Sequence, residues 1–132
     1  MARVKLLVDT DIFIDYLKGI KTAKVLFSSK EVEIYYSVLT KKELLSKPGL
    51  RNSERRRIIR VLRKLKPIKI DKDIAEKFSL LQDKYGNEPV KAPDFIIAAT
   101  AWSKKLPLLT RNIKHFDYID EIRLSPIYEI TT

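Results

Sequence analysis

The 132-residue chain is 45% hydrophobic and 33% charged, a composition typical of a globular domain and not of a disordered segment. It has no cysteine and a single histidine, which excludes disulfides, thiolate metal sites and histidine-rich zinc sites and favours a cytoplasmic location. The formal net charge is +10, and no apolar run is long enough for a signal peptide or a membrane-spanning helix.

The first predicted element is a buried strand that ends in an acid. Residues 4–8 are almost all apolar, which is typical of a strand in a parallel sheet covered on both faces, and Asp9 follows directly. Ligands bind at this carboxyl edge in open α/β sheets. From residue 12 the apolar period becomes helical, and Gly19 is a suitable stop for the helix.

Several acids accompany the start of that helix. Asp9 and Asp11 are close at the strand end, which is costly unless a positive group lies between them, and a metal ion is the simplest candidate. Asp11 and Asp15 are four residues apart and share one helix face. The alternative is structural: Thr10 or Asp11 caps the helix, and Asp9 is a loop residue.

Strands and helices continue to alternate after Gly19. A short second helix precedes an aromatic strand at residues 33–37, and Ser37 or Thr40 caps the helix that follows. Glu43 lies in that helix. It is either a catalytic acid or the partner of Thr40 in a capping box.

A strongly basic helix is predicted next, with Ser53 as its cap and Pro67 as its terminator. Residues 51–66 contain eight Lys or Arg and one Glu, so most of the excess positive charge is concentrated there. Such a concentration suggests a polyanionic partner, although a solvated face on a stable protein is the alternative. Contacts with nucleic acid or a protein partner are predicted for Arg55, Arg56, Arg60 and Arg63.

The second half of the chain repeats the strand–helix pattern. A strand is predicted at residues 68–70, followed by a helix that Asp71 caps and Gly86 stops, and then a loop at 87–92. Pro93 fits the first turn of a buried helix, which places Asp94 in that turn.

The last core strand is predicted at residues 107–110, with edge strands at 122–124 and 127–130. Strands alternating with helices predict one α/β domain over residues 1–132. Its fold class is three-layer, with a mainly parallel central sheet flanked by helices.

Acidic and polar residues recur at equivalent places in this pattern. Asp9 ends the first strand, Glu43 follows the second, Asp94 begins a late helix, and Thr110 and Asn112 follow the last core strand. Taken singly, each has a structural alternative, since a helix N-terminus tolerates an acid and turns favour threonine and asparagine. Taken together, they predict carboxylates that converge around a divalent cation, for which oxygen ligands favour Mg²⁺ or Mn²⁺.

These residues also carry a resemblance to a known family. The chain resembles PIN-domain ribonucleases, and among them the VapC-type toxins of toxin–antitoxin pairs. The resemblance rests on four blocks in the family's order, which span almost the whole chain: residues 7–17, residues 40–44 with Glu43, residues 93–101 and residues 109–116.

The resemblance implies a PIN fold and metal-dependent endoribonuclease activity. It implies that Asp9, Glu43 and Asp94 form the acidic centre, with Mg²⁺ or Mn²⁺ held chiefly by Asp9 and Asp94 and with Glu43 as a further ligand. It also implies an RNA substrate, a homodimer and a VapB-type antitoxin partner. The residues predicted to line the same pocket are Thr10, Asp11 and Thr110.

One departure from the family pattern concerns the last block. Many members carry a fourth acid there, whereas the candidate positions in this chain hold Asn112 and His115. We place Asn112 in the catalytic set, because its carbonyl oxygen can bind a metal ion without adding charge. His115 is predicted to be a packing or RNA-contact residue and not a general base.

Two other functions fit parts of the sequence. A phosphatase of the haloacid dehalogenase class also begins with a strand ending in Asp-x-Asp, but Phe13 stands where that motif needs a small residue, and no late Gly-Asp acid pair follows. A PIN-like scaffold that binds RNA or a partner without cutting is the other alternative.

Overall fold

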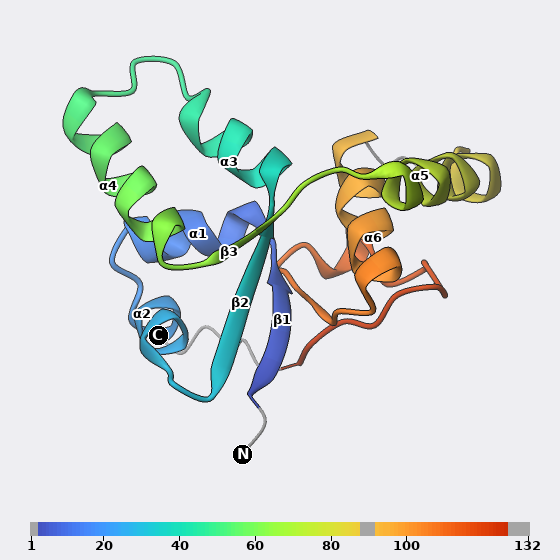
Figure 1. Cartoon of the computed structure of the whole chain (residues 1–132), viewed down its shortest axis with the longest axis horizontal. Coiled ribbons are helices and arrows are strands. Elements are labelled where there is room, and N and C mark those ends of the chain that lie inside the picture. Colours follow the sequence, from blue (N-terminus) through green and yellow to red (C-terminus); the bar gives the residue numbers. More distant parts are fainter. Residues whose placement is uncertain (1–2, 88–91, 127–132) are drawn as a thin grey trace.

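The computed structural model describes residues 3–87 and 92–126. It shows a parallel four-stranded sheet between two groups of helices (Figure 1), which confirms the predicted fold class. The strand order is β3-β2-β1-β4. In chain order the elements are β1 (Val4–Val8), α1 (Thr10–Leu17), α2 (Lys21–Ser28), β2 (Val32–Ser37), α3 (Val38–Leu45), α4 (Asn52–Arg63), β3 (Lys66–Ile68), α5 (Lys72–Tyr85), α6 (Ala92–Lys104), β4 (Leu108–Leu109) and the short 3₁₀ helix η1 (Ile113–His115).

The alternation of side chains along β1 explains the three layers. Leu6 and Val8 point to one face of the sheet and pack with α1, α2 and α4, whereas Leu7 points to the other face and packs with α5 and α6. All three side chains are at most 1% exposed, so β1 is the central strand of both cores. Figure 1 shows α1 to α4 on one side of the strands and α5 and α6 on the other.

The topology brings three chain segments to one edge of the sheet. β1 pairs in parallel with both β2 and β4, so Asp9, the start of α3 and Thr110 all follow strands at the same carboxyl edge. Helix α6 runs in the opposite direction to the strands. Because only residues 105–107 connect α6 to β4, the first turn of α6, with Asp94, lies toward the carboxyl edge.

Two helix caps show which residues begin α1 and α3, for which the sequence left alternatives. Asp9, and not Thr10 or Asp11, caps α1, since its side chain accepts a hydrogen bond from the Thr10 N–H. Ser37 caps α3 through the Leu39 N–H, as one of the two predictions stated. The capping box that would have occupied Glu43 is therefore absent from α3.

Several predicted boundaries were wrong by a few residues. The basic helix α4 follows Arg51 and not Ser53, because Glu54 accepts a hydrogen bond from the Arg51 N–H. The third strand is β3, Lys66–Ile68, and contains Pro67, which a strand at the edge of the sheet tolerates.

The C-terminal segment also departs from its prediction. The strand predicted at 122–124 is reduced to a single bridge between Leu124 and Leu108, and the one at 127–130 lies outside the described residues. Across residues 3–87 and 92–126, we find no helix of the length and apolarity that crossing a bilayer requires.

Candidate functional site

The carboxyl edge of the sheet carries a small acidic pocket of about 220 Å³. It contains four of the predicted catalytic and metal-binding residues, which come from separate segments of the chain. We call it the acidic pocket, and it is lined by Asp9, Thr10, Asp11, Ile14, Glu43, Pro93, Asp94, Ile97 and Asn112.

Asp9 is the most deeply buried acid of the pocket, with 7% of the residue exposed. One carboxylate oxygen accepts the Thr10 N–H at 2.8 Å, and the other accepts the Thr110 hydroxyl at 2.8 Å. Burial, and then the negative charges of Asp11 and Asp94, raise the pKa of Asp9 to about 6 in spite of these hydrogen bonds. A positive ion beside the Asp9 carboxylate would stabilise its charged form.

Asp11 faces the segment after β4. Its Oδ2 accepts the Arg111 N–H at 2.8 Å, whereas its buried Oδ1 has no hydrogen-bond partner among the described residues. Burial raises the pKa of the Asp11 carboxyl. The Arg111 side chain passes on to Asp15, with 2.8 Å between Nε and Oδ2. Arg111 is therefore the positive group beside the face of α1 that Asp11 and Asp15 share.

Replacing Arg111 by Gln should lower the free energy of unfolding by about 1–2 kcal/mol, because the buried Asp15 carboxylate loses this charged partner. The value lies below that of a fully buried pair, since the Arg111 side chain is 39% exposed. Urea unfolding in chelator would measure the loss. In the Arg111→Gln background, Asp15→Asn should recover part of it, whereas simply additive losses would contradict a direct pair.

Glu43 reaches the pocket from the second turn of α3. Its Oε1 accepts the Thr10 hydroxyl at 2.8 Å, and the hydroxyls of Thr10 and Thr40 are hydrogen-bonded at 2.9 Å. Thr40 is fully buried, so this chain of hydroxyls links Glu43 to the protein interior. The contact orients Glu43 toward the start of α1.

Asp94 and His115 form a pair that the sequence analysis did not predict. Asp94 Oδ2 lies 3.1 Å from His115 Nδ1. Nothing in the spacing of the two residues indicates this contact, which depends on how η1 packs against α6. Asn112 lines the pocket, while its N–H donates to the Thr110 hydroxyl at 3.0 Å. The last block thus presents an amide and an imidazole to the acids.

The donors of this pocket fit a divalent cation chemically, since carboxylate and amide side chains line it together with a buried acid whose pKa is raised by burial and by negative neighbours. No three acidic or histidine side chains of the described residues are already clustered as a metal site. In this structure Glu43 is held by Thr10, and Asp94 is paired with His115.

The predicted basic contacts lie outside the acidic pocket. The side chains of Arg55, Arg56, Arg60 and Arg63 are exposed on α4, whereas Ile58 of the same helix is buried. A larger cavity of about 640 Å³ between α1, α3 and α4 shares Thr10, Ile14 and Glu43 with the acidic pocket. We call this cavity the α1–α4 groove. It connects the acids to the basic helix.

Comparisons with known proteins show which family the chain belongs to. The family model described as "PIN domain" matches residues 6–122. Ribonuclease VapC19 of Mycobacterium tuberculosis is 31% identical over 122 residues, which are 89% of this chain and 96% of the relative. Ribonuclease VapC1 of Methanocaldococcus jannaschii is 30% identical over 128 residues, which are 95% of this chain and 88% of the relative.

Solved structures show the same fold. A toxin–antitoxin complex from Klebsiella pneumoniae contains a chain that is 32% identical, with a TM-score of 0.76 and coverage of 95% of this chain and 99% of that chain. VapBC2 from Rickettsia felis, bound to a DNA fragment from its promoter, gives a TM-score of 0.81 at 20% identity, over 92% and 98% of the two chains. The sequence matches and the shared fold together establish that this chain belongs to the PIN-domain family, in its VapC branch.

Proposed function

We propose that this protein is a divalent-metal-dependent endoribonuclease and the toxin of a VapBC-type toxin–antitoxin system. The observation that carries the proposal is the acidic pocket, in which Asp9, Glu43, Asp94 and Asn112 meet at the carboxyl edge of a PIN-type sheet. The relatives named as ribonucleases support the activity, and the Klebsiella pneumoniae complex supports the toxin–antitoxin setting. An RNA substrate also implies a cytoplasmic location.

In this proposal Asp9 and Asp94 hold Mg²⁺ or Mn²⁺, with Glu43 and Asn112 as further oxygen ligands. When bound, such an ion supplies charge for the phosphodiester oxygens and a more acidic water. Thr110 and the Thr10 N–H fix the Asp9 carboxylate by hydrogen bonds to both of its oxygens. Their role is to keep Asp9 ionised and oriented, because hydrogen bonds to a carboxylate counteract the effect of burial on its pKa.

The α1–α4 groove suits the antitoxin. Its apolar walls fit side chains of an extended or helical peptide, and its connection to Thr10 and Glu43 would let a bound segment cover the acids. Both cations and acids line the groove, so a bound segment can form ion pairs there as well as apolar contacts. The apolar residues of the groove are Ile14, Leu17, Leu44, Leu50 and Ile58.

We also expect this protein to form a homodimer, as the family resemblance implies. Light scattering would measure its oligomeric state.

The proposed activity is tested by incubating the purified protein with a mixed cellular RNA pool in Mg²⁺, in Mn²⁺ and in chelator. We expect internal cuts that require the metal and are mapped by the sequencing of new ends. The control variant Asp83→Asn removes one negative charge from the exposed side of α5 and should cut normally.

Two results would contradict the proposal. Release of phosphate from a small phosphomonoester without internal RNA cuts would favour the phosphatase, which the PIN-family match does not support. Metal-independent RNA binding by a folded protein that never cuts any RNA of the pool would favour the scaffold.

A further inference from the structure

Another pocket lies between α1, α2 and the basic helix α4 and combines cations with stacked aromatic rings. It has a volume of about 360 Å³, and among its lining residues are Tyr16, Phe27, Arg57, Arg60 and Lys64. The rings of Tyr16 and Phe27 are stacked with 4.5 Å between centroids and 19° between their planes. We call this the cationic pocket, because three of its described lining residues are basic and none is acidic.

The walls of the cationic pocket are held by the rest of the fold. Phe27 packs edge-on against Phe13, with ring centroids 5.1 Å apart, and Phe13 is only 1% exposed. The Arg57 guanidinium donates to the Leu17 carbonyl at 2.8 Å and so satisfies the C-terminal end of α1. Arg60, in the last turn of α4, and Lys64, the C-cap residue of this helix, remain exposed. The pocket thus has a rigid aromatic base and two accessible cations.

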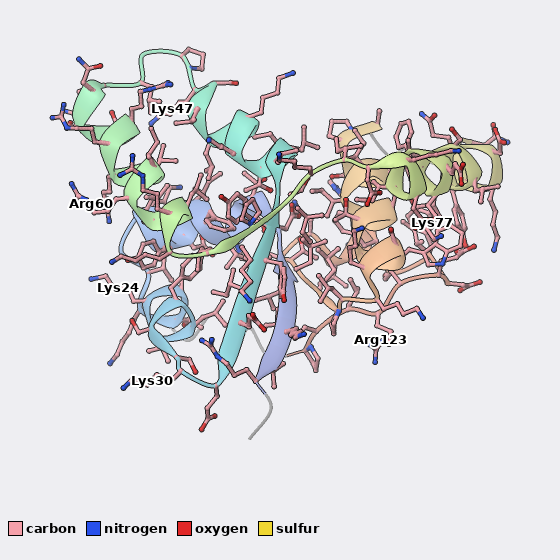
Figure 2. All side chains as sticks on the ribbon, in the orientation of Figure 1. Lys24, Lys30, Lys47, Arg60, Lys77 and Arg123 are labelled. Atoms are coloured by element: carbon pink, nitrogen blue, oxygen red, sulfur yellow. The ribbon has the colours of Figure 1, made fainter. Side chains whose placement is uncertain are left out.

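A pocket on the far side of the molecule shows what distinguishes this one. That pocket, of about 510 Å³, also has an aromatic ring, Trp102, and three basic residues, which are Lys77, Lys105 and Arg123. However, Asp120 and Glu121 lie beside them, and acids neutralise cations at short range. Figure 2 shows Arg60 at one end of the molecule and Arg123 toward the other. Unbalanced positive charge next to stacked rings suits phosphate and nucleobase together.

The position of the cationic pocket relates it to the acidic pocket. Thr10 lines the acidic pocket and Tyr16 lines the cationic pocket, six residues further along α1, or about 9 Å at about 1.5 Å per residue. The α1–α4 groove connects the two pockets, because it shares Arg57 with the cationic pocket and Thr10 and Glu43 with the acidic pocket. A single RNA strand that follows this groove can contact both pockets.

We propose that the cationic pocket binds a nucleotide of the RNA strand whose phosphodiester lies in the acidic pocket. The base packs against the Tyr16–Phe27 pair, and the adjoining phosphates contact Arg60 and Lys64. Because the two pockets are separate, RNA longer than a dinucleotide gains affinity that shorter RNA lacks. This inference rests on the proposed RNA substrate.

The test is fluorescence anisotropy of a labelled short oligoadenylate, titrated with protein in EDTA at several salt concentrations. Arg60→Gln with Lys64→Gln should weaken binding at least about fivefold and lower the slope of log K against log salt by about 1.4. Tyr16→Leu should weaken binding about fivefold or more with the slope retained, because only stacking is lost. The matched control, Lys105→Gln with Arg123→Gln, removes the same charge from the far pocket.

The outcomes separate this inference from the proposed nuclease. Equal weakening of RNA binding by the two double variants would show that only net charge matters and would overturn the proposed nucleotide site. Unchanged RNA affinity in the Arg60 and Lys64 variant would also overturn it, even if that variant bound a protein partner less tightly. Specific binding in EDTA by a protein that never cuts in Mg²⁺ would refute the nuclease and leave the pocket intact. Thermal unfolding checks that Tyr16→Leu is folded, and the exposed cations provide an independent test.

Discussion

Replacing Asp9 by asparagine should give a protein that no longer cuts RNA and yet is more stable than the wild type. The loss of activity should be at least about 1,000-fold, since the variant removes the central carboxylate of the proposed metal site and several kcal/mol of charge stabilisation. The gain in stability has a different cause. Burial and the neighbouring Asp11 and Asp94 disfavour the charged Asp9, as its raised pKa of about 6 shows.

The sign of the stability effect follows from proton binding. The folded protein holds a proton on Asp9 up to about pH 6, whereas the unfolded chain releases it near 3.8. Without metal, the free energy of unfolding of the wild type therefore falls as pH rises from about 4 to about 6 and then levels off. Asp9→Asn removes this dependence and should be on the order of 1–3 kcal/mol more stable at pH 7.

Urea unfolding in chelator at pH 4.5 and pH 7 measures both parts of this prediction. Asp83→Asn, on the exposed side of α5, is the control for removing an aspartate and should leave stability and cleavage unchanged. A lower stability of Asp9→Asn at pH 7 would mean that the hydrogen bonds from Thr10 and Thr110 outweigh the cost of burying the charge.

Asp94→Asn should lose divalent-ion binding and cleavage while the fold is retained. Asp94 is half-buried in the first turn of α6, and its hydrogen-bond partner His115 is exposed, so little packing is lost. We expect Mn²⁺ affinity to fall at least about tenfold by calorimetry. Added Mn²⁺ should raise the melting temperature of the wild type but not that of the variant, because only an ion that binds the folded state stabilises it.

His115→Gln is the control variant for Asp94→Asn. It removes the imidazole beside Asp94 but leaves every acid of the acidic pocket in place, so Mn²⁺ binding should persist. Unchanged Mn²⁺ affinity in Asp94→Asn would remove Asp94 from the metal site. Loss of binding in His115→Gln alone would make the histidine a ligand.

The sheet was predictable because its strands are short, continuous apolar runs. Burial on both faces leaves such runs few alternatives, and the change of period after Asp9 marks the start of α1. Alternation then predicts a parallel sheet, whose carboxyl edge receives Asp9 and Glu43 before any side-chain geometry is known. Asp94 joins them only because α6 begins near that edge, which the sequence permits but does not determine. Caps were less predictable, since Arg51 at the start of α4 is not a residue type that favours this position.

The contacts within the site could not be predicted in the same way. Arg111 and His115 follow a strand of only two residues, so their partners depend on how the segment after β4 packs against α1 and α6. A sequence pattern gives the order of such residues but not their rotamers. The one available signal was a lone arginine between Thr110 and Asn112, at an edge already rich in acids.

The central place of β1 in the sheet has a consequence for the synthesis of the protein. β1 is made first, but its neighbour β4 and the threonine that contacts Asp9 lie about a hundred residues later, since the Thr110–Asp9 hydrogen bond spans a separation of 101. Contacts of this range form late, because a long loop must close before they stabilise the chain. On the ribosome, a nascent chain that ends before β4 has its first acid but neither Thr110 nor Asn112. We therefore expect the proposed cleavage of RNA to begin only after the last core strand has emerged.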